Sequence, residues 1–140
     1  MPTAIFVNLP VADLGVSRTF YTGLGYTINE NFSNDDGICV VITESIYVML
    51  LVPAFFQSFT PRPISDATTS TEVLLAVSTD SRDDVDRHIA AAVAGGGTET
   101  RETQDMGFMY SRAYSDPDGH IWEILWMDPA AAESGPPAEQ

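Results

Sequence analysis

One carboxylate, Glu123, lies inside an otherwise apolar run near the end of the chain. The run from residue 121 to residue 127 reads Ile, Trp, Glu, Ile, Leu, Trp, Met. A charge inside such a strand is unfavourable unless it is paired, bound to a metal or turned toward a wet cavity. Glu123 is therefore the first candidate for chemistry in this chain.

The segment Asp116-Pro117-Asp118-Gly119 before this strand predicts a tight turn. Proline presets φ, aspartate side chains bond nearby backbone groups, and glycine accepts a positive φ. We expect a hairpin in which Ser115 pairs with His120 across this turn.

That register predicts the neighbours of Glu123 on the preceding strand. Arg112 lies directly opposite Glu123 on the same face, Tyr110 opposes Leu125, and Phe108 opposes Met127. Three interpretations of Glu123 stay open: an acid neutralised by Arg112, an acid that contacts a ligand, or a metal ligand.

The positions of apolar and turn residues predict the same order of elements twice. Each half has a strand, a helix and three further strands, so the fold class is α+β with two βαβββ modules. The modules span about residues 4–52 and 72–128, and in their superposition Met49 falls opposite Glu123. The predicted strands are 4–9, 26–32, 38–43 and 46–52 in the first half, and 72–79, 98–103, 107–115 and 120–127 in the second. The helices begin at caps Asp13 and Ser81 and end at Gly25 and at residues 95–97.

The two modules form one domain, residues 1–128, and the segments outside the modules differ in character. The linker 53–71 carries Phe55, Phe56 and Phe59, and we expect it to fold back over an apolar surface. The tail 129–140 is rich in Ala, Glu, Gly and Pro, which predicts disorder.

Composition excludes several classes of partner. Twenty acidic against six basic residues give a net charge of −14, whereas nucleic acids and anionic membranes require basic patches. A neutral or cationic small molecule is compatible with this charge. No apolar run is long enough to cross a bilayer, and the chain starts without a basic leader. The one cysteine, Cys39, lies in an apolar run, so we expect a buried thiol in a cytoplasmic protein.

Two motifs resemble those of the vicinal oxygen chelate superfamily, which includes glyoxalase I, extradiol dioxygenases and the bleomycin and fosfomycin resistance proteins. Val11-Ala12-Asp13, then Ser17, Phe20-Tyr21 and Leu24-Gly25-Tyr26, resemble V-x-D-x-x-x-S-x-x-F-Y-x-x-L-G-F. Asp116-Pro117-Asp118-Gly119 with Glu123 resembles D-P-D-G-x-x-x-E. The likeness covers about residues 4–128 and implies curved mixed sheets around a cleft.

The resemblance also implies where enzymes of this superfamily hold a divalent metal. The four ligand positions correspond to Phe6, Met49, either Glu72 or Leu74, and Glu123. Phe6 offers no lone pair, and a Met thioether suits soft metals. The histidines, His88 and His120, are expected to be solvated and do not replace the missing ligands. We therefore expect no metal and no cofactor; if a metal binds, Glu123 and Glu72 are its candidate ligands.

The remaining residues of the predicted cleft face are apolar or aromatic, which suits a flat ligand. The candidate ligand-binding residues are Phe6, Asn8, Tyr47, Met49, Leu51, Phe55, Phe56, Phe59, Phe108, Tyr110, Arg112 and Glu123.

These features favour a metal-free protein that binds and sequesters an antibiotic or another aromatic, and in some cases cationic, natural product. One alternative is a metal-dependent glyoxalase- or dioxygenase-like enzyme that uses Glu123. Another is a metal-free isomerase or hydrolase with Glu123 as general base and Arg112 beside an oxyanion. The resemblance also implies a homodimer.

Overall fold

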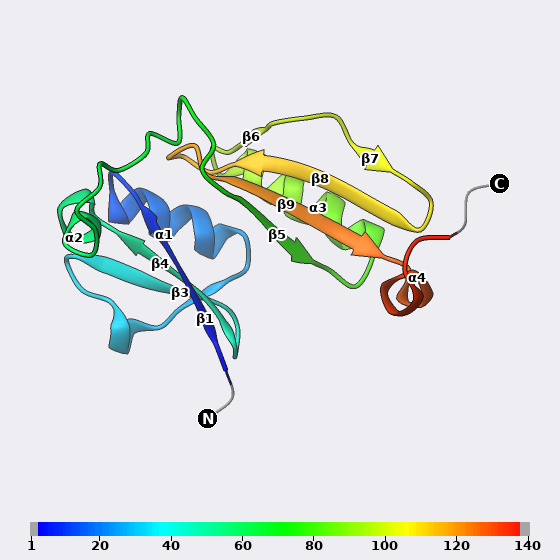
Figure 1. Cartoon of the computed structure of the whole chain (residues 1–140), viewed down its shortest axis with the longest axis horizontal. Helices are drawn as coiled ribbons and strands as arrows, with labels where there is room; N and C mark the ends of the chain where they lie inside the picture. The colour runs from blue at the N-terminus through cyan, green and yellow to red at the C-terminus, as the bar shows by residue number, and fades with distance from the viewer. Residues whose placement is uncertain (1–2, 138–140) are drawn as a thin grey trace. The chain divides into compact units, whose positions relative to one another are not determined.

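The computed structural model describes residues 3–137 (Figure 1). The chain divides into two compact units, the first ending at Glu72 and the second beginning at Val73. Each unit has its own mixed sheet and its own helix, as the α+β prediction requires.

The first unit contains a four-stranded sheet in the order β1-β4-β3-β2, in which β1 runs parallel to β4 and the other pairs are antiparallel. Its elements are β1 (Ile5–Pro10), α1 (Leu14–Gly23), β2 (Thr27–Ile28), the 3-10 helix η1 (Glu30–Phe32), β3 (Gly37–Thr43), β4 (Ile46–Leu51) and α2 (Pro53–Gln57).

The second unit repeats this plan in a five-stranded sheet of order β5-β9-β8-β6, with β7 also paired to β8. Again the strand before the helix, β5, runs parallel to the last strand, β9. Its elements are β5 (Leu74–Ser78), α3 (Arg82–Ala94), β6 (Thr98–Glu99), β7 (Gln104–Asp105), β8 (Met109–Ser115), β9 (Ile121–Met127) and α4 (Pro129–Ser134).

The two long helices begin and end where the sequence predicts. The Asp13 carboxylate accepts a hydrogen bond from the Val16 N–H at 3.1 Å, and the Ser81 hydroxyl accepts one from the Asp84 N–H at 3.0 Å. Each cap satisfies a backbone donor that the first turn leaves free. Just past the helix ends, Gly25 and Gly96 have φ values of 100° and 106°, which favour glycine over other residues.

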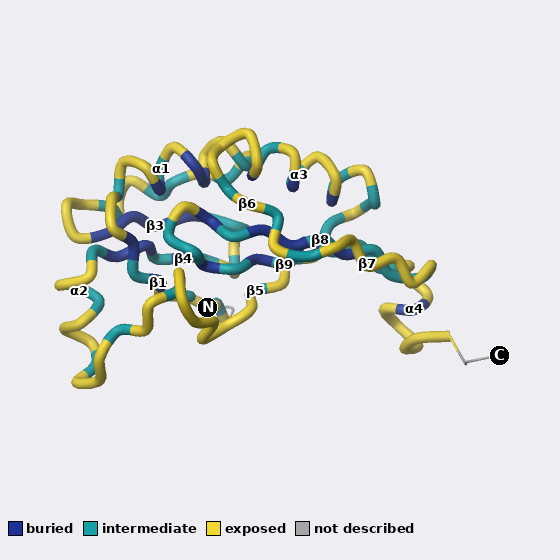
Figure 2. The backbone as a smooth tube through the Cα atoms, turned by 90° about the horizontal axis from the view of Figure 1, so that it is seen from above, coloured by how far each residue is buried: buried dark blue, intermediate teal, exposed yellow. Residues whose placement is uncertain are grey.

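In each unit the long helix covers one face of the sheet, and the buried residues are concentrated between that helix and its sheet (Figure 2). Side chains alternate between faces along a strand, so every second residue enters this core. The buried side chains of the first unit include Leu9, Phe20, Tyr21, Val40 and Leu50, and those of the second include Val85, Ile89, Tyr114, Trp122 and Ile124. The opposite face of each sheet, called the open face below, bears the predicted site residues Met49 and Glu123.

Two predicted strands are much shorter than expected. In place of the strand 26–32, only Thr27–Ile28 pairs with β3, because Asn29 caps a 3-10 turn by accepting a hydrogen bond from the Asn31 N–H at 3.1 Å. In place of the strand 98–103, the chain pairs at Thr98–Glu99, bends, and pairs again at Gln104–Asp105.

Each of the two segments outside the predicted modules contains a short helix. Residues 53–57 of the predicted linker form α2, and residues 129–134 of the predicted disordered tail form α4. Asp128 caps α4 by accepting from the Ala130 N–H at 3.0 Å, and Pro129 follows at the first helical position. This is a strong helix start, so the prediction of disorder is wrong there; residues 138–140 lie outside the described residues. None of the helices within residues 3–137 is long and apolar enough to span a membrane.

Candidate functional site

The open face of the first sheet gathers the predicted residues of β1 and β4. In their parallel register Phe6 lies beside Tyr47, Asn8 beside Met49, and Pro10 beside Leu51. The prediction that these residues share one face is confirmed. Leu51 is buried, 2% exposed, so it belongs to the packed interior of this face rather than to its surface.

Two aromatic rings stack at the exposed end of this face. The centroids of Phe6 and Tyr47 are 4.8 Å apart and their planes differ by 10°. The Tyr47 hydroxyl donates a hydrogen bond to the Glu44 carbonyl at 2.7 Å, which fixes the ring. Phe6 is 55% exposed, so its second face is available to a flat molecule.

A pocket of about 400 Å³ lies next along β1, lined by Asn8, Phe56, Phe59 and Thr60. Phe56 comes from α2, which begins at Pro53, and Phe59 follows directly after the helix. Phe55 does not line the pocket but packs edge to face on Phe59, with ring centroids 5.1 Å apart. The aromatic segment after β4 thus makes one wall of the pocket, and a strand residue makes the other.

In the second unit the predicted pairing of Arg112 with Glu123 is wrong. Ser115 pairs with Ile121 rather than His120, so Glu123 lies opposite Ala113, and Arg112 lies opposite Ile124. A shift of one residue moves every side chain to the other face.

The turn itself causes this shift. The Asp116 carboxylate accepts hydrogen bonds from the N–H groups of Asp118 at 3.0 Å and His120 at 2.9 Å. The Asp116 N–H also donates to the His120 carbonyl at 2.9 Å. His120 therefore closes the loop, and the ladder resumes only at Ser115 and Ile121.

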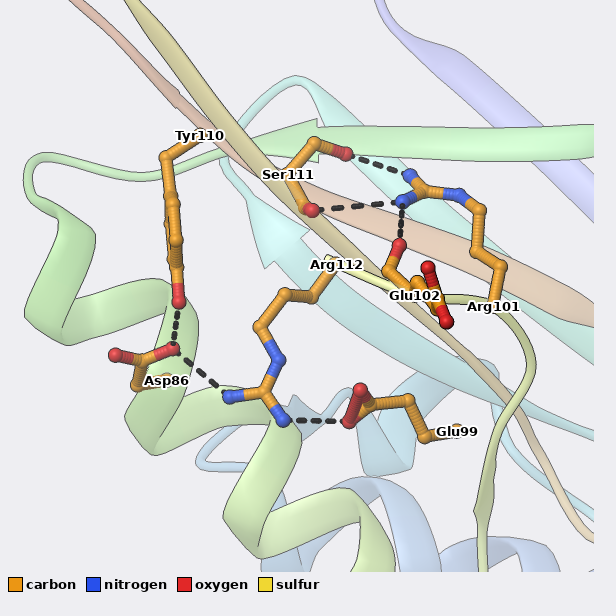
Figure 3. A network of polar contacts seen from close by, with 7 residues as sticks. All are labelled: Asp86, Glu99, Arg101, Glu102, Tyr110, Ser111 and Arg112. Atoms are coloured by element: carbon orange, nitrogen blue, oxygen red, sulfur yellow. Dashed lines mark hydrogen bonds and ion pairs between the residues drawn. The ribbon is translucent and has the colours of Figure 1, made fainter. Parts of the chain in front are cut away.

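The partner of Glu123 is Arg101, from the bend between β6 and β7. The guanidinium of Arg101 lies 3.4 Å from Glu123 Oε1 and 2.7 Å from the Ser111 hydroxyl, to which it donates. It also donates to the carbonyls of Glu102 and Ser111, as Figure 3 shows. The side chains of Arg101 and Glu123 are 25% and 29% exposed. Glu123 is thus a paired carboxylate on a partly wet open face.

Arg112 belongs to a separate network on the helix side of the sheet (Figure 3). It donates to Asp86 of α3 at 2.8 Å and to Glu99 of β6. The Tyr110 hydroxyl donates to the same Asp86 carboxylate at 2.6 Å. These hydrogen bonds, that from Tyr110 first and that from Arg112 second, hold the pKa of Asp86 below its ordinary value.

The predicted register placed Phe108, Tyr110 and Arg112 on the same face as Glu123, and the observed register does not support this placement. Tyr110 lies opposite Trp126 and shares the helix-side face with Arg112. Phe108 precedes β8, and its carbonyl accepts a hydrogen bond from the Asp128 N–H at 2.7 Å.

The two histidines are not solvated, contrary to prediction. His120 is buried in the turn before β9. His88 of α3 lies 3.3 Å from the Tyr114 hydroxyl through Nε2, and burial lowers the pKa of His88 to about 4. His88 is therefore neutral at physiological pH. The prediction of a buried Cys39 is confirmed, and burial raises the pKa of its thiol.

Comparison with known proteins gives one family match and many structural matches. Residues 3–43 match the family described as bleomycin resistance protein-like, N-terminal. A hypothetical protein from S. aureus is 27% identical with a TM-score of 0.76, over 90% of this chain and 95% of that one. A glyoxalase-related enzyme from Fulvimarina pelagi is 23% identical with a TM-score of 0.75, over 90% and 88%. The fosfomycin resistance protein FosX from Mesorhizobium loti is 14% identical with a TM-score of 0.68, over 95% and 98%. No curated protein sequence matches.

The chain has the vicinal oxygen chelate fold. The resemblance seen in the sequence motifs is confirmed at this level.

The repeat within the vicinal oxygen chelate fold identifies which residue of β5 corresponds to Phe6. Met49 and Glu123 are equivalent in the two units; Asn8 lies beside Met49, and Ala76 lies beside Glu123. Two residues earlier on each strand stand Phe6 and Leu74. Leu74 rather than Glu72 therefore occupies the third predicted ligand position, and Glu72 precedes the strand.

These positions do not fit the divalent metal that the vicinal oxygen chelate fold implies. Phe6 and Leu74 have no donor atom, Met49 offers only a thioether, and Glu123 already faces a guanidinium. Hard divalent ions prefer oxygen and nitrogen ligands. Within residues 3–137, no group of three or more His, Cys, Asp or Glu side chains is arranged to hold a metal ion.

Sequence reasoning missed Arg101, Ser111 and Thr60. Arg101 contacts Glu123 because the chain bends after β6, and Ser111 contacts Arg101 because of the register of β8. Neither the bend nor the register produces a local pattern in the sequence. The scarcity of basic residues was the available signal: with only six for twenty acids, each arginine was a candidate partner for Glu123.

Proposed function

We propose that this protein binds and sequesters a small aromatic molecule, such as an antibiotic or another natural product, without chemically changing it. The observation that carries this proposal is the aromatic open face of the first unit. Phe56 and Phe59 offer ring surfaces to a pocket of about 400 Å³, and the stacked pair Phe6 and Tyr47 offers further ring surface on the same sheet face.

The free energy of apolar burial and ring stacking in such a site supports ligand binding, and its lining residues are not of catalytic types. Burial of apolar area contributes about 25 cal/mol per Å², and each well-placed ring pair adds about 0.5–1.5 kcal/mol. The pocket walls contribute no acid, base or nucleophilic thiol, since the polar lining residues are Asn8 and Thr60. The match of residues 3–43 to a bleomycin resistance protein-like family is compatible with an antibiotic ligand.

The test is to titrate the protein with aromatic antibiotics, recover each bound compound and measure its mass. We expect saturable binding and an unchanged compound. Phe59→Ser should weaken binding about tenfold, because about 1.4 kcal/mol corresponds to a factor of ten. Phe59 is 69% exposed, so this change should not impair folding.

Phe32 provides a matched control, since it is another exposed phenylalanine of the first unit, 70% exposed, and does not line the pocket. Phe32→Ser should leave the affinity unchanged. Equal affinities for the Phe59 variant and the wild type would contradict the proposed site. Turnover of the recovered compound would contradict sequestration.

Glu123 supports a second candidate function, proton abstraction from a small substrate. Its carboxylate lies on the open face of the second sheet and is held there by Arg101, in the geometry of a positioned general base. Arg112 cannot assist it, because Arg112 lies on the other face. Catalysed solvent deuterium exchange into a carbonyl compound, abolished by Glu123→Gln, would favour this function over sequestration.

We also propose a homodimer, as the resemblance implies. Sedimentation velocity at micromolar concentration tests this, and a single monomeric species would overturn it.

A further inference from the structure

The arginines of this chain are scarce, and nearly all are engaged. All six basic residues are arginines. Five form ion pairs: Arg18 with Glu30, Arg82 with Asp105, Arg87 with Asp84, Arg101 with Glu123, and Arg112 with Asp86 and Glu99. The sixth, Arg62, has no ion pair with any side chain in residues 3–137. Among the residues that the structure describes, Arg62 is therefore the arginine without a carboxylate partner.

Arg62 lies beside the aromatic pocket of the first unit. It follows two residues after Thr60, which lines the pocket. The Gln57 side-chain amide donates to the carbonyls of Thr60 at 2.8 Å and Arg62 at 2.7 Å. The Arg62 N–H in turn donates to the Thr60 hydroxyl at 3.2 Å. The backbone at Arg62 is thus tied to the pocket wall, while its side chain is exposed.

The pocket itself supplies no charge. Its lining residues Asn8, Phe56, Phe59 and Thr60 are all neutral. Asp66, the acid nearest to Arg62 along the chain, accepts hydrogen bonds from the Thr68 N–H at 2.9 Å and the Thr68 hydroxyl at 2.6 Å. Within the described part of the chain, the pocket therefore offers a ligand aromatic contacts, and Arg62 nearby offers a cation.

We propose that the pocket of the first unit takes an aromatic compound bearing an acidic group, such as an aryl carboxylate or sulfonate, whose anion is bound by Arg62. This inference rests on the proposed function, that the pocket binds an aromatic molecule. The guanidinium presents a planar fork of donors that matches a carboxylate or sulfonate.

The net charge of −14 predicts attraction of cations at long range, but contact depends on local charge. At physiological ionic strength charges are screened beyond about 8 Å. A guanidinium carried by Arg62, two residues beyond the pocket residue Thr60, therefore counts for more than exposed acids further away. The preference for an anion should appear as a selectivity between matched ligands rather than as fast association.

Two fluorescent probes with the same ring system test the preference. N-phenyl-1-naphthylamine is neutral, and 8-anilinonaphthalene-1-sulfonate adds a sulfonate to the same framework. Arg62→Gln should weaken sulfonate binding about three- to tenfold, as an exposed charge pair allows, and change binding of the neutral probe less than about twofold. Arg62→Lys should retain part of the sulfonate affinity.

Arg87→Gln is the matched control, because it removes the same charge from an exposed arginine of the other unit, 71% exposed. It should alter neither affinity. If Arg87→Gln weakens sulfonate binding as much as Arg62→Gln does, the effect is one of net charge and the inference is overturned.

Phe59→Ser separates the two proposals. It should weaken both probes if the pocket is the binding site. If Phe59→Ser affects neither probe, the proposed function fails. If it weakens both while Arg62→Gln weakens neither or both equally, the pocket binds aromatic molecules but the anion inference is wrong.

Discussion

Both units pack a helix on an apolar sheet face, and the second also places an ion-paired network beside its helix. Under α1 lie residues such as Val40, Val48 and Leu50. Beside α3, Arg112 joins Asp86 and Glu99. The open faces also differ, because the first carries stacked aromatic rings and the second carries an ion pair.

The difference teaches that the repeated framework fixes positions but not chemistry. Met49 and Glu123 occupy the same place on the last strand of each unit, yet one is a thioether and the other a carboxylate. Caps, glycine turns and alternation are the shared features, and they concern the backbone. The side chains on the two faces are free to differ as long as each charge finds a partner.

The largest effect should come from truncating the equivalent core residues Leu50 and Ile124, which follow Met49 and Glu123. Both are fully buried. We expect each change to alanine to lower the free energy of unfolding by about 2–5 kcal/mol, measured by urea denaturation with circular dichroism. A loss below about 1 kcal/mol for either would show that the two cores are not built alike.

The network beside α3 should be the next most sensitive feature. Arg112→Met keeps the aliphatic stem but leaves Asp86 and Glu99 without their cation. Because these groups are partly exposed, we expect a loss of about 1–3 kcal/mol, less than for a fully buried pair. Arg87 is an exposed arginine of α3 outside this network, and Arg87→Met should change the free energy of unfolding by less than about 0.5 kcal/mol. Equal effects of the two changes would mean that the network is not stabilising.

His88 gives the second unit a histidine-linked pH dependence of stability, and both histidines of the chain lie in that unit. Its folded pKa of about 4 lies below the ordinary value of 6.5, so protonation favours the unfolded chain. This stability is complete above about pH 6.5 and is lost as the pH falls toward 4. We expect a loss of about 1–2 kcal/mol between pH 7.5 and pH 5.

The measurement is the urea midpoint of wild type and His88→Gln at the two pH values. The variant should lose less stability on acidification than the wild type. Identical slopes would show that the carboxylates alone set the acid sensitivity.

The smallest effect concerns the ion pair on the open face of the second sheet. A double-mutant cycle with Arg101→Met and Glu123→Gln should give a coupling energy of about 0.5–1 kcal/mol, as for a partly exposed pair. A cycle that replaces Arg101→Met by Arg112→Met should give none within error. Coupling of Glu123 to Arg112 instead would contradict the strand register in the structure.

The sequence predicts the framework well because its signals are local. Asp13, Ser81, Gly25 and Gly96 each act within one turn of chain, and alternation places Phe6 and Tyr47 on one face. The short β2 and the bend after β6 were missed because pairing there depends on neighbouring strands rather than on propensity.

The partner of Glu123 could not be predicted for a related reason. The hairpin register depends on how many residues the turn contains, and the hydrogen bonds of the Asp116 carboxylate set that number. A change of one residue in this number moves every side chain of the strand to the opposite face of the sheet. Arg101 also reaches Glu123 across β8, a relation between distant segments. The sequence thus shows that Glu123 needs a partner, but only the tertiary structure shows that this partner is Arg101.

The distribution of rare residues gives each unit its own internal reporter. Cys39, the single cysteine, is buried in β3 of the first unit, and both tryptophans, Trp122 and Trp126, belong to β9 of the second. A thiol reagent reaches Cys39 only when the first unit opens, whereas indole emission follows the second. Opening of the two halves is therefore separately observable in the unlabelled wild-type chain.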